Sequence, residues 1–328
     1  MNTMKWLVRR EFWEHKGAMF WAPIIAAALM FCLLSGSMSY GAAHGELQEQ
    51  MAFKVTKDGD RTVIHNIGME TISAEKLAEF TSAAASGYIG IAAPLFLMLA
   101  VVTFFYCLSA LHDERRDRSI LFWKSLPVSD TQTVLSKVLT AGIVAPLITI
   151  AAGVFLSILT ALVIGAVAAV NGINLLGPVL SNADFYLTPL RVFGLLPVYL
   201  VWALPTIGWL LLVSSWAKSK VFLWAVGAPL LAVAMIKWAT HILGVGIKMD
   251  WVVENVIARG LVGLVPGNWF PLAHLDKAAL ADQGAGAVAH IFTASWMTLA
   301  TPQALFGAAA GAAMIFAAIR IRRWKDEG

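Results

Sequence analysis

Charged and aromatic side chains gather in residues 112–137, where they could contact another protein. The charged run 113–118 comes first, and Leu121, Phe122 and Trp123 follow it directly. Large aromatic side chains beside charges are typical of the anchor residues of protein interfaces. The same aromatic side chains would also suit the headgroup region of a membrane, and composition alone does not separate these two interpretations.

The order of residues in this segment predicts a short helix, a turn and a second helix. Opposite charges within 113–118 favour local ion pairs and a helical start. Pro127 ends the first helix, because the residue before a proline disfavours the helical conformation. Ser129 and Gln132 have the spacing of a capping box, which predicts that the next helix begins there.

No sequence motif in the chain indicates catalysis. We find no G-x-x-x-x-G-K-[ST] loop for nucleotide phosphates and no G-x-S-x-G nucleophile turn. H-E-x-x-H and paired C-x-x-C patterns are also missing, and the seven histidines are scattered. We therefore expect no catalytic residues, no cofactor-binding residues and no metal ligands.

Six long apolar stretches predict an all-α integral membrane protein organised as a single domain over residues 1–328. The chain is 59% hydrophobic and 13% charged, whereas soluble domains carry about 25% charged residues. A bilayer core of ~30 Å needs about 20 apolar residues in a helix, and a backbone in lipid must satisfy its own hydrogen bonds. The six stretches cover residues 17–40, 86–111, 138–170, 191–215, 221–236 and 301–319.

The distribution of lysine and arginine predicts the orientation in the membrane. Most of these 24 residues fall at the two ends of the chain and in the loops after the second and fourth stretches. By the positive-inside rule, both termini are cytoplasmic in a multi-pass protein of the cell (inner or plasma) membrane. The basic residues are split among four short segments, so they do not indicate a nucleic-acid partner.

Residues 1–16 predict an amphipathic helix that lies at the membrane surface. At helical spacing, one arc holds apolar residues and another holds basic residues. Trp6 and Trp13 fall on the basic arc, which indicates that this face contacts either protein or lipid headgroups. The apolar arc consists of Met1, Met4, Val8 and Phe12, and the basic arc of Lys5, Arg9 and Lys16.

Two longer segments lie on the predicted outer side. Residues 41–85 form an acidic insertion, in which 54–64 suggests a hairpin and 73–80 a helix. Residues 237–300 predict short outer helices before the sixth span, because their apolar runs are interrupted. The free cysteines Cys32 and Cys107 are expected at different depths, where they could not form a disulfide.

Gly307 and Gly311 in the sixth stretch predict a close approach between helices. Glycines four residues apart leave one helix face without side chains, so another backbone can come near. The sequence does not decide whether that second helix belongs to the same chain or to another copy.

At residues 114–129 the sequence resembles the type-2 ABC transporter permease family. This stretch reads ERRDRSILFWKSLPVS, and Lys137 follows at a fitting distance. The amino-terminal residues REFWE at 10–14, with Arg9 before them, look like the interfacial helix of that family. Six spans with both termini inside and helices before the sixth span are also similar to the family's topology.

This resemblance implies a permease subunit that works with two copies of a separate ABC ATPase subunit. The subunit would form a homodimer and export a hydrophobic, peptide or drug-like substrate through the dimer interface. Residues 112–130 would be the coupling helix that docks on the ATPase, assisted by the interfacial helix at 1–16. The implied coupling residues are Glu114, Arg115, Arg118, Leu121, Phe122, Trp123 and Pro127, and those of the interfacial helix are Trp6, Arg9, Arg10 and Trp13.

Two other functions remain open at the level of sequence. A transporter driven by an ion gradient would need ionisable residues deep within several spans, which the apolar stretches do not provide. A membrane scaffold or signalling subunit could use the same ATPase without moving a solute, and sequence does not separate it from a transporter.

Overall fold

The structure is a computed structural model that describes residues 3–44, 84, 87–125, 127–170, 174, 176–243, 253, 257, 259–273 and 287–324. Its elements are helices, and these ranges contain no strand. Within the described residues, six helices are long and apolar enough to cross a membrane, namely Gly17–Gly41, Tyr88–Arg116, Asp130–Val170, Ala183–Trp216, Leu223–Ile242 and Pro302–Trp324. The prediction of an all-α, multi-pass membrane protein is confirmed at this level.

The elements follow one another as short pieces joined into these long helices. Their bounds are α1 Thr3–Glu14, η1 Gly17–Trp21, α2 Ala22–Ala43, η3 Tyr88–Ala92, α5 Ala93–Ser109, α6 His112–Arg116, α7 Ser119–Ser125, α8 Asp130–Leu139, η4 Thr140–Val144, α9 Ala145–Val170, α10 Leu176–Ser181, α11 Ala183–Gly194, α12 Leu196–Trp216, η5 Leu223–Gly227, α13 Ala228–Leu243, α15 Arg259–Val262, α16 Trp269–Leu272, α18 Ala287–Met297, η7 Thr298–Ala300 and α19 Pro302–Trp324.

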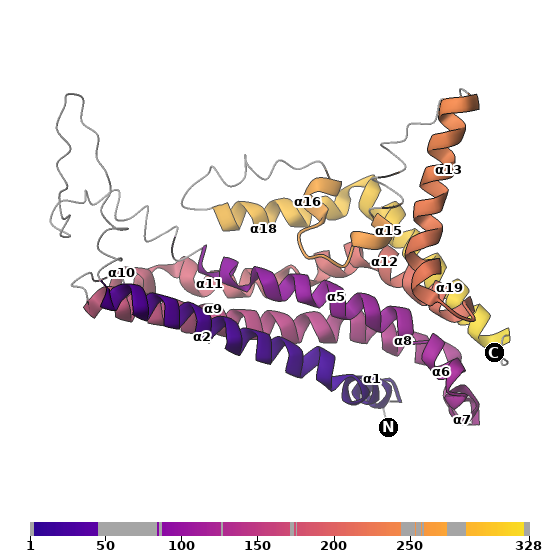
Figure 1. Ribbon diagram of the computed structural model, residues 1–328, viewed down its shortest axis with the longest axis horizontal. Coiled ribbons are helices and arrows are strands. Elements are labelled where there is room, and N and C mark those ends of the chain that lie inside the picture. The colour runs from indigo at the N-terminus through magenta and orange to yellow at the C-terminus, as the bar shows by residue number, and fades with distance from the viewer. Residues whose placement is uncertain are drawn as a thin grey trace.

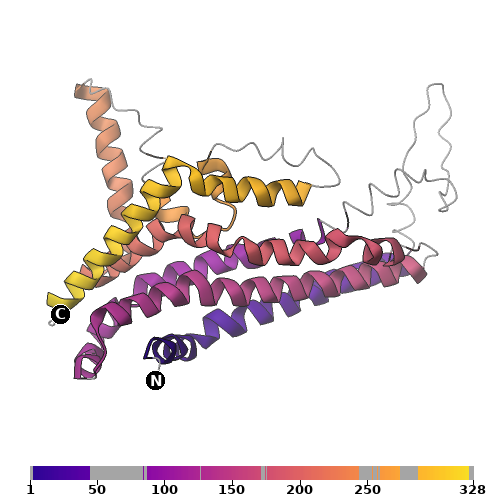
Figure 2. The same cartoon turned by 180° about the vertical axis from the view of Figure 1, so that it is seen from behind.

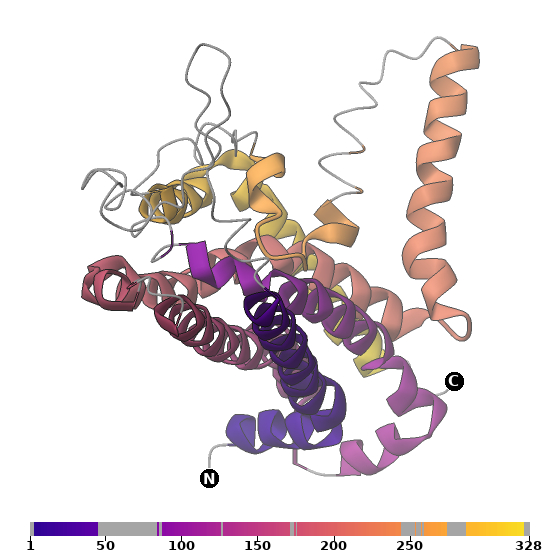
Figure 3. The ribbon, with the colours of Figure 1, turned by 60° about the vertical axis from the view of Figure 1, so that its left-hand side comes forward.

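The long helices α2, α5 and α9 run side by side, and α12 lies against α5 and α19 (Figure 1). The α12 helix forms the centre of the core, where Trp202, Ile207, Leu210 and Leu211 are fully buried. The α13 helix projects away from the other helices and is largely exposed (Figure 3). Both ends of the chain lie at the same end of the bundle as α6 and α7, which we call the hub end (Figure 2).

The capping box predicted at Ser129 is present and starts the third long helix. The Ser129 hydroxyl accepts a hydrogen bond from the Gln132 N–H at 3.2 Å, and the Gln132 side chain accepts one from the Ser129 N–H at 3.4 Å. This helix therefore begins well before the apolar stretch that was predicted to start at residue 138. The extra turns form α8, which is only weakly apolar and carries Lys137.

In three of the long helices, the turn directly before an Ala-Pro pair is wider than an α-helical turn. In η1, η4 and η5 the alanine N–H bonds to the carbonyl five residues earlier instead of four. The prolines that follow, Pro23, Pro146 and Pro229, have no N–H to donate, and a proline ring clashes with the carbonyl four residues before it. The wider π-turn relieves this clash, so each helix continues through its proline.

The α12 and α19 helices cross in close contact at two glycines. A Cβ atom on Gly311 would lie 2.6 Å from the carbonyl carbon and oxygen of Leu204, and a Cβ on Gly208 would lie 2.6 Å from the Gly311 oxygen. Gly311 therefore packs within the chain, and Gly307 contacts Arg259 of the same chain. The close approach between helices occurs at Gly311, whereas Gly307 makes room for a side chain.

We expect Gly311→Ala to destabilise the protein by about 1–3 kcal/mol, because the methyl group would push against the α12 backbone, which cannot move aside like a side chain. Thermal unfolding in detergent would measure this loss. Gly36→Ala in α2 is the matched control, because a Cβ there meets open space, and we expect unchanged or slightly higher stability. Equal melting temperatures for both variants would contradict the close crossing.

Other predictions have mixed outcomes. The hairpin at 54–64 and the helix at 73–80 lie outside the described residues. Within 237–300 the structure places α15, α16 and α18, and α18 with η7 is apolar but shorter than the six long helices, as predicted. Cys32 is exposed, Cys107 is buried, and both are free. The fourth long helix begins at Ala183 instead of residue 191, because α11 precedes the bend before Pro197.

Candidate functional site

A network of buried charges connects four helices at the hub end of the bundle. We define the ionic hub as Glu11 of α1, Glu114 of α6, Lys137 of α8 and Arg322 of α19. Relative exposures of these residues are 0%, 9%, 2% and 3%. They come from positions far apart in the sequence, so the hub exists only because the fold brings the four helices together.

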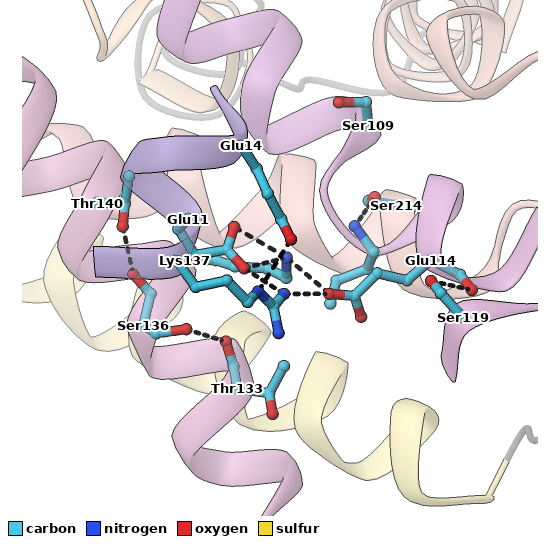
Figure 4. A network of polar contacts seen from close by, with 12 residues as sticks. Glu11, Glu14, Ser109, Glu114, Ser119, Thr133, Ser136, Lys137, Thr140 and Ser214 are labelled. Atoms are coloured by element: carbon cyan, nitrogen blue, oxygen red, sulfur yellow. Dashed lines mark hydrogen bonds and ion pairs between the residues drawn. The ribbon is translucent and has the colours of Figure 1, made fainter. Parts of the chain in front are cut away.

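Lys137 is the central cation of the hub (Figure 4). Its Nζ donates to both carboxylate oxygens of Glu11, at 3.0 and 3.1 Å, and lies 2.9 Å from Oε1 of Glu114. Oε2 of Glu11 also accepts a hydrogen bond from the Tyr106 hydroxyl of α5 at 2.9 Å. One ammonium group therefore holds the interfacial helix and α6 against the start of the third long helix.

Arg322 extends the hub to the last helix of the chain. Its Nη1 contacts Oε2 of Glu114, and its Nε donates to Oδ1 of Asp130 at 3.1 Å. Asp130 is the first residue of α8, directly after the capping serine. The carboxy-terminal end of α19 is thus fixed to α6 and α8 at the same time.

Arg10 joins α1 to α6 through a charge contact and to α7 through an aromatic contact. Its Nη2 lies 2.7 Å from Glu11 and 3.2 Å from Glu114. Its guanidinium also lies over the Trp123 ring, with Cζ 3.8 Å from the ring centroid, and the Trp6 ring is 6.3 Å from the same ring. Stacking of a guanidinium on tryptophan is favourable, so these contacts position Trp123 against α1.

The charges of the hub depend strongly on one another. A buried ion needs partners, since removing one member of a buried pair typically costs about 3–5 kcal/mol while the intact pair adds little net stability. Each carboxylate of the hub contacts at least two cations. The network therefore specifies one relative placement of α1, α6, α8 and α19.

A second set of contacts ties α6 to the carboxy-terminal end of α12. The Ser214 hydroxyl accepts hydrogen bonds from the Leu111 and His112 N–H groups, both at 3.0 Å. The Arg115 Nη2 donates to the carbonyls of Ser214 at 2.7 Å and Ala217 at 2.9 Å. These carbonyls end α12, so the guanidinium caps that helix and holds α6 against its end.

The corner between α6 and α7 points outward. Arg118 adopts a φ of +56°, a left-handed conformation that turns the chain sharply. Arg116 and Asp117 next to it have side chains that are 65% and 63% exposed. α6 and α7 therefore have one side fixed to the bundle and a polar corner free to meet another molecule.

No family model, curated protein or solved structure matches this chain.

The predicted coupling residues divide into two groups. Glu114 and Arg115 turn inward, which differs from the expected polar contacts with a partner. Glu114 pairs with Lys137 of the hub, and Arg115 donates a hydrogen bond to a carbonyl at the end of α12. Arg118 and Pro127 are exposed, and Trp123 is partly buried against α1. The side chains of Leu121 and Phe122 lie outside the described part of the structure, so their predicted contacts stay predictions.

The predicted interfacial helix forms as α1, and the residues that it buries against the chain belong to neither of the two predicted arcs. Leu7 and Glu11 are its buried residues, whereas Met4, Val8 and Phe12 are only partly buried and Met1 lies outside the described residues. Trp6 is partly exposed and meets Trp123, while Trp13 and Arg9 are exposed. The basic arc therefore contacts protein at Trp6.

Sequence reasoning missed most of the hub. Glu11 and Lys137 were noted only for their fit to the family resemblance, and Arg322 only for its charge. Tyr106 lies inside an apolar stretch and gave no signal. Glu11 offered one clue, because it stands four residues after Leu7, where a surface helix would place an apolar side chain toward the core.

A metal site at α1 does not fit the contacts. Glu11, Glu14 and His15 place their possible ligand atoms within 4.8 Å of one another. Both oxygens of Glu11 are already bonded to Lys137, Arg10 and Tyr106, and Glu14 pairs with Arg10 at 3.2 Å. The carboxylates therefore serve as counter-ions of the hub.

Proposed function

We propose that this chain is the membrane-spanning permease subunit of an ATP-driven ABC transporter, and that α6 and α7 form its coupling element. The observation that carries the proposal is the mounting of these two short helices. Buried contacts fix them to α1, α8, α12 and α19, while the corner at residues 116–118 stays exposed. A force applied at that corner would be passed to several long helices at once.

The contacts suggest how movement would be transmitted. A separate ABC ATPase would hold the exposed corner on the cytoplasmic side, with both termini on that side. Closure of two such ATPases would move α6 and α7, and the ionic hub would carry α1, the start of the third long helix and the end of α19 with them. The long helices would tilt and change access to a cavity between two copies of the chain.

The location of the ionic hub favours this role over transport driven by an ion gradient. A gradient-driven transporter needs ionisable groups near the middle of its spans. The hub instead lies at the ends of the long helices, with Glu11 before the first span and Arg322 in the last turns of α19. Charges at helix ends suit a mechanical joint.

We propose that the substrate is hydrophobic and is exported. An apolar groove beside the hub supports the hydrophobic character of the substrate. Its volume is about 480 Å³, and it lies along α5 close to the start of α2. Met19, Val101, Phe105 and Val221 supply its apolar lining, and His15 and His112 lie on its polar margin. Such a lining suits lipid-like, peptide or drug-like molecules better than sugars.

Purification of the full-length chain from membranes of its own host would test this function. We expect the chain alone to hydrolyse no ATP and the co-purified complex to show vanadate-sensitive ATPase activity. Reversing both charges in Arg116→Glu/Arg118→Glu should reduce the co-purified activity about tenfold or more, because the loss of two docking contacts exceeds 1.4 kcal/mol.

Lys218→Glu is the matched control for this experiment. Lys218 is an exposed cation after α12 and makes none of the hub contacts. The control should retain the co-purified activity. ATP turnover by the chain alone, or equal activity in the double variant and the wild type, would refute the assignment as a coupled permease.

A further inference from the structure

Arg259, the first residue of α15, is buried between α12 and α19, away from the hub. Only 5% of the residue is exposed. Its guanidinium lies over the Trp202 ring, with Cζ 4.6 Å from the ring centroid. On the α19 side it reaches Gly307 so closely that a Cβ there would lie 2.5 Å from Cζ. A glycine at position 307 thus makes the room that the guanidinium occupies.

The Arg259 guanidinium has no counter-ion among the described residues. Its Nε and Nη2 are buried and have no hydrogen-bond partner. The other buried cations behave differently, because Lys137 and Arg322 each contact two carboxylates. A buried and unpaired charge is among the most unfavourable arrangements in a protein, so a partner for Arg259 is expected.

Hydrogen bonds with α12 hold the backbone at Arg259 in place. The Thr206 hydroxyl donates to the Arg259 carbonyl at 2.8 Å and accepts from the Gly263 N–H at 3.1 Å. Asn268, nine residues later, has a buried Nδ2 that also lacks a partner. The hydrogen bond from Thr206 fixes the backbone of Arg259 against α12.

Arg259 contacts α19 near the amino-terminal end of that helix. Gly307 is the sixth residue of α19, so the guanidinium lies about 7 Å along the helix from its first residue. Burial lowers the pKa of the Arg259 guanidinium from its ordinary value, yet arginine remains charged in proteins. Guanidinium groups bind phosphate oxygens through paired hydrogen bonds.

We propose that Arg259 anchors an anion site at the junction of α12, α15 and α19 that binds the phosphate group of a ligand. A phospholipid headgroup and a soluble phosphate share this chemistry, and either would supply the missing acceptor oxygens. The site lies at the opposite end of α12 from α6 and does not depend on the ATPase coupling proposed above.

Thermal unfolding of the purified full-length protein in a neutral detergent tests the site. Phosphatidylglycerol, phosphatidylcholine and inorganic phosphate are added separately to the wild type, Arg259→Gln and Arg259→Lys. We expect phosphatidylglycerol to raise the wild-type melting temperature by roughly 5 °C at saturation. Arg259→Gln should lose this shift, and Arg259→Lys should retain part of it, because lysine keeps the charge and lacks the paired donors.

The three probes distinguish the source of the phosphate group. A shift with phosphatidylglycerol alone assigns a lipid headgroup, and a comparable shift with inorganic phosphate assigns a soluble ligand. Arg191→Gln is the matched control, because Arg191 is already paired with Asp184 at 2.8 Å, and it should keep the full shift.

The proposal also predicts the behaviour of the variants without ligand. Removing an uncompensated charge should leave the melting temperature of Arg259→Gln within a few degrees of the wild-type value or above it. Equal shifts in the wild type and Arg259→Gln, or no wild-type shift with any probe, would overturn the site. Failure of both Arg259 variants to fold would assign the residue a purely structural role and would overturn it as well.

Discussion

Lys137→Met is expected to destabilise the folded protein by about 3–5 kcal/mol. The substitution keeps an unbranched, apolar side chain of similar length and removes the ammonium group with its charge and its hydrogen-bond donors. Glu11 would then keep only Arg10 as a cationic partner, and Glu114 would keep Arg10 and Arg322. The loss of stabilising contacts is largest at Glu11, because this residue is fully buried and its Oε2 would retain only the hydrogen bond from the Tyr106 hydroxyl.

Thermal unfolding in detergent, followed by the loss of monodisperse protein, would measure this effect. Lys218→Met is the control, because Lys218 is exposed and its replacement should change the stability by less than about 0.5 kcal/mol. The double variant Glu11→Gln/Lys137→Met should recover part of the loss, since it removes the carboxylate together with its cation.

Two outcomes would argue against the hub as a coupled network. The first is a Lys137→Met protein as stable as the Lys218→Met control. The second is a double variant whose loss of stability equals or exceeds the sum of the losses of the two single variants, because side chains that act independently have additive effects.

The helices of this protein could be predicted from sequence because their signals are local. Apolar length marked the six long helices, and the spacing of Ser129 and Gln132 marked the start of α8. Pro127 correctly separated α7 from α8. These signals depend on residues within one or two turns of each other, so no knowledge of the tertiary structure was needed.

The hub could not be predicted because its members are up to 311 positions apart and each has an ordinary alternative explanation. Arg322 near the end of a span satisfies the positive-inside rule whether or not it binds Glu114. Glu114 and Arg115 lie in a charged run whose neighbours are exposed, and only packing against α8 and α12 selects these two for burial. Helical spacing alone did not identify the buried face of α1 either, because Glu11 is charged and stands among the core-facing positions.

The inward position of Glu114 changes how the proposed coupling works. A carboxylate at a docking surface would contribute through a direct contact with the ATPase. Glu114 instead contacts Lys137, Arg10 and Arg322, so it joins α6 to three other helices. The Trp123 ring stacks against the Arg10 guanidinium, and this contact holds α7 to α1. We infer that these residues transmit movement after docking and do not themselves choose the partner.

Glu114→Gln should therefore separate ATP hydrolysis from transport. Glutamine has nearly the same shape but no charge, so three cations lose a shared anion and the joint between α6 and the long helices weakens. We expect substrate flux into vesicles of the reconstituted complex to fall about tenfold or more, because weakening a buried charged pair costs about 2–5 kcal/mol and 1.4 kcal/mol is a factor of ten. The ATPase subunit should still co-purify, since the exposed corner at 116–118 is unchanged.

Asp113→Asn is the matched control on the same helix, because Asp113 is half-exposed and pairs only at the surface with His112 and Arg116. Loss of co-purification in Glu114→Gln would move the residue to the docking surface, and full transport by this variant would show that the hub does not carry the movement.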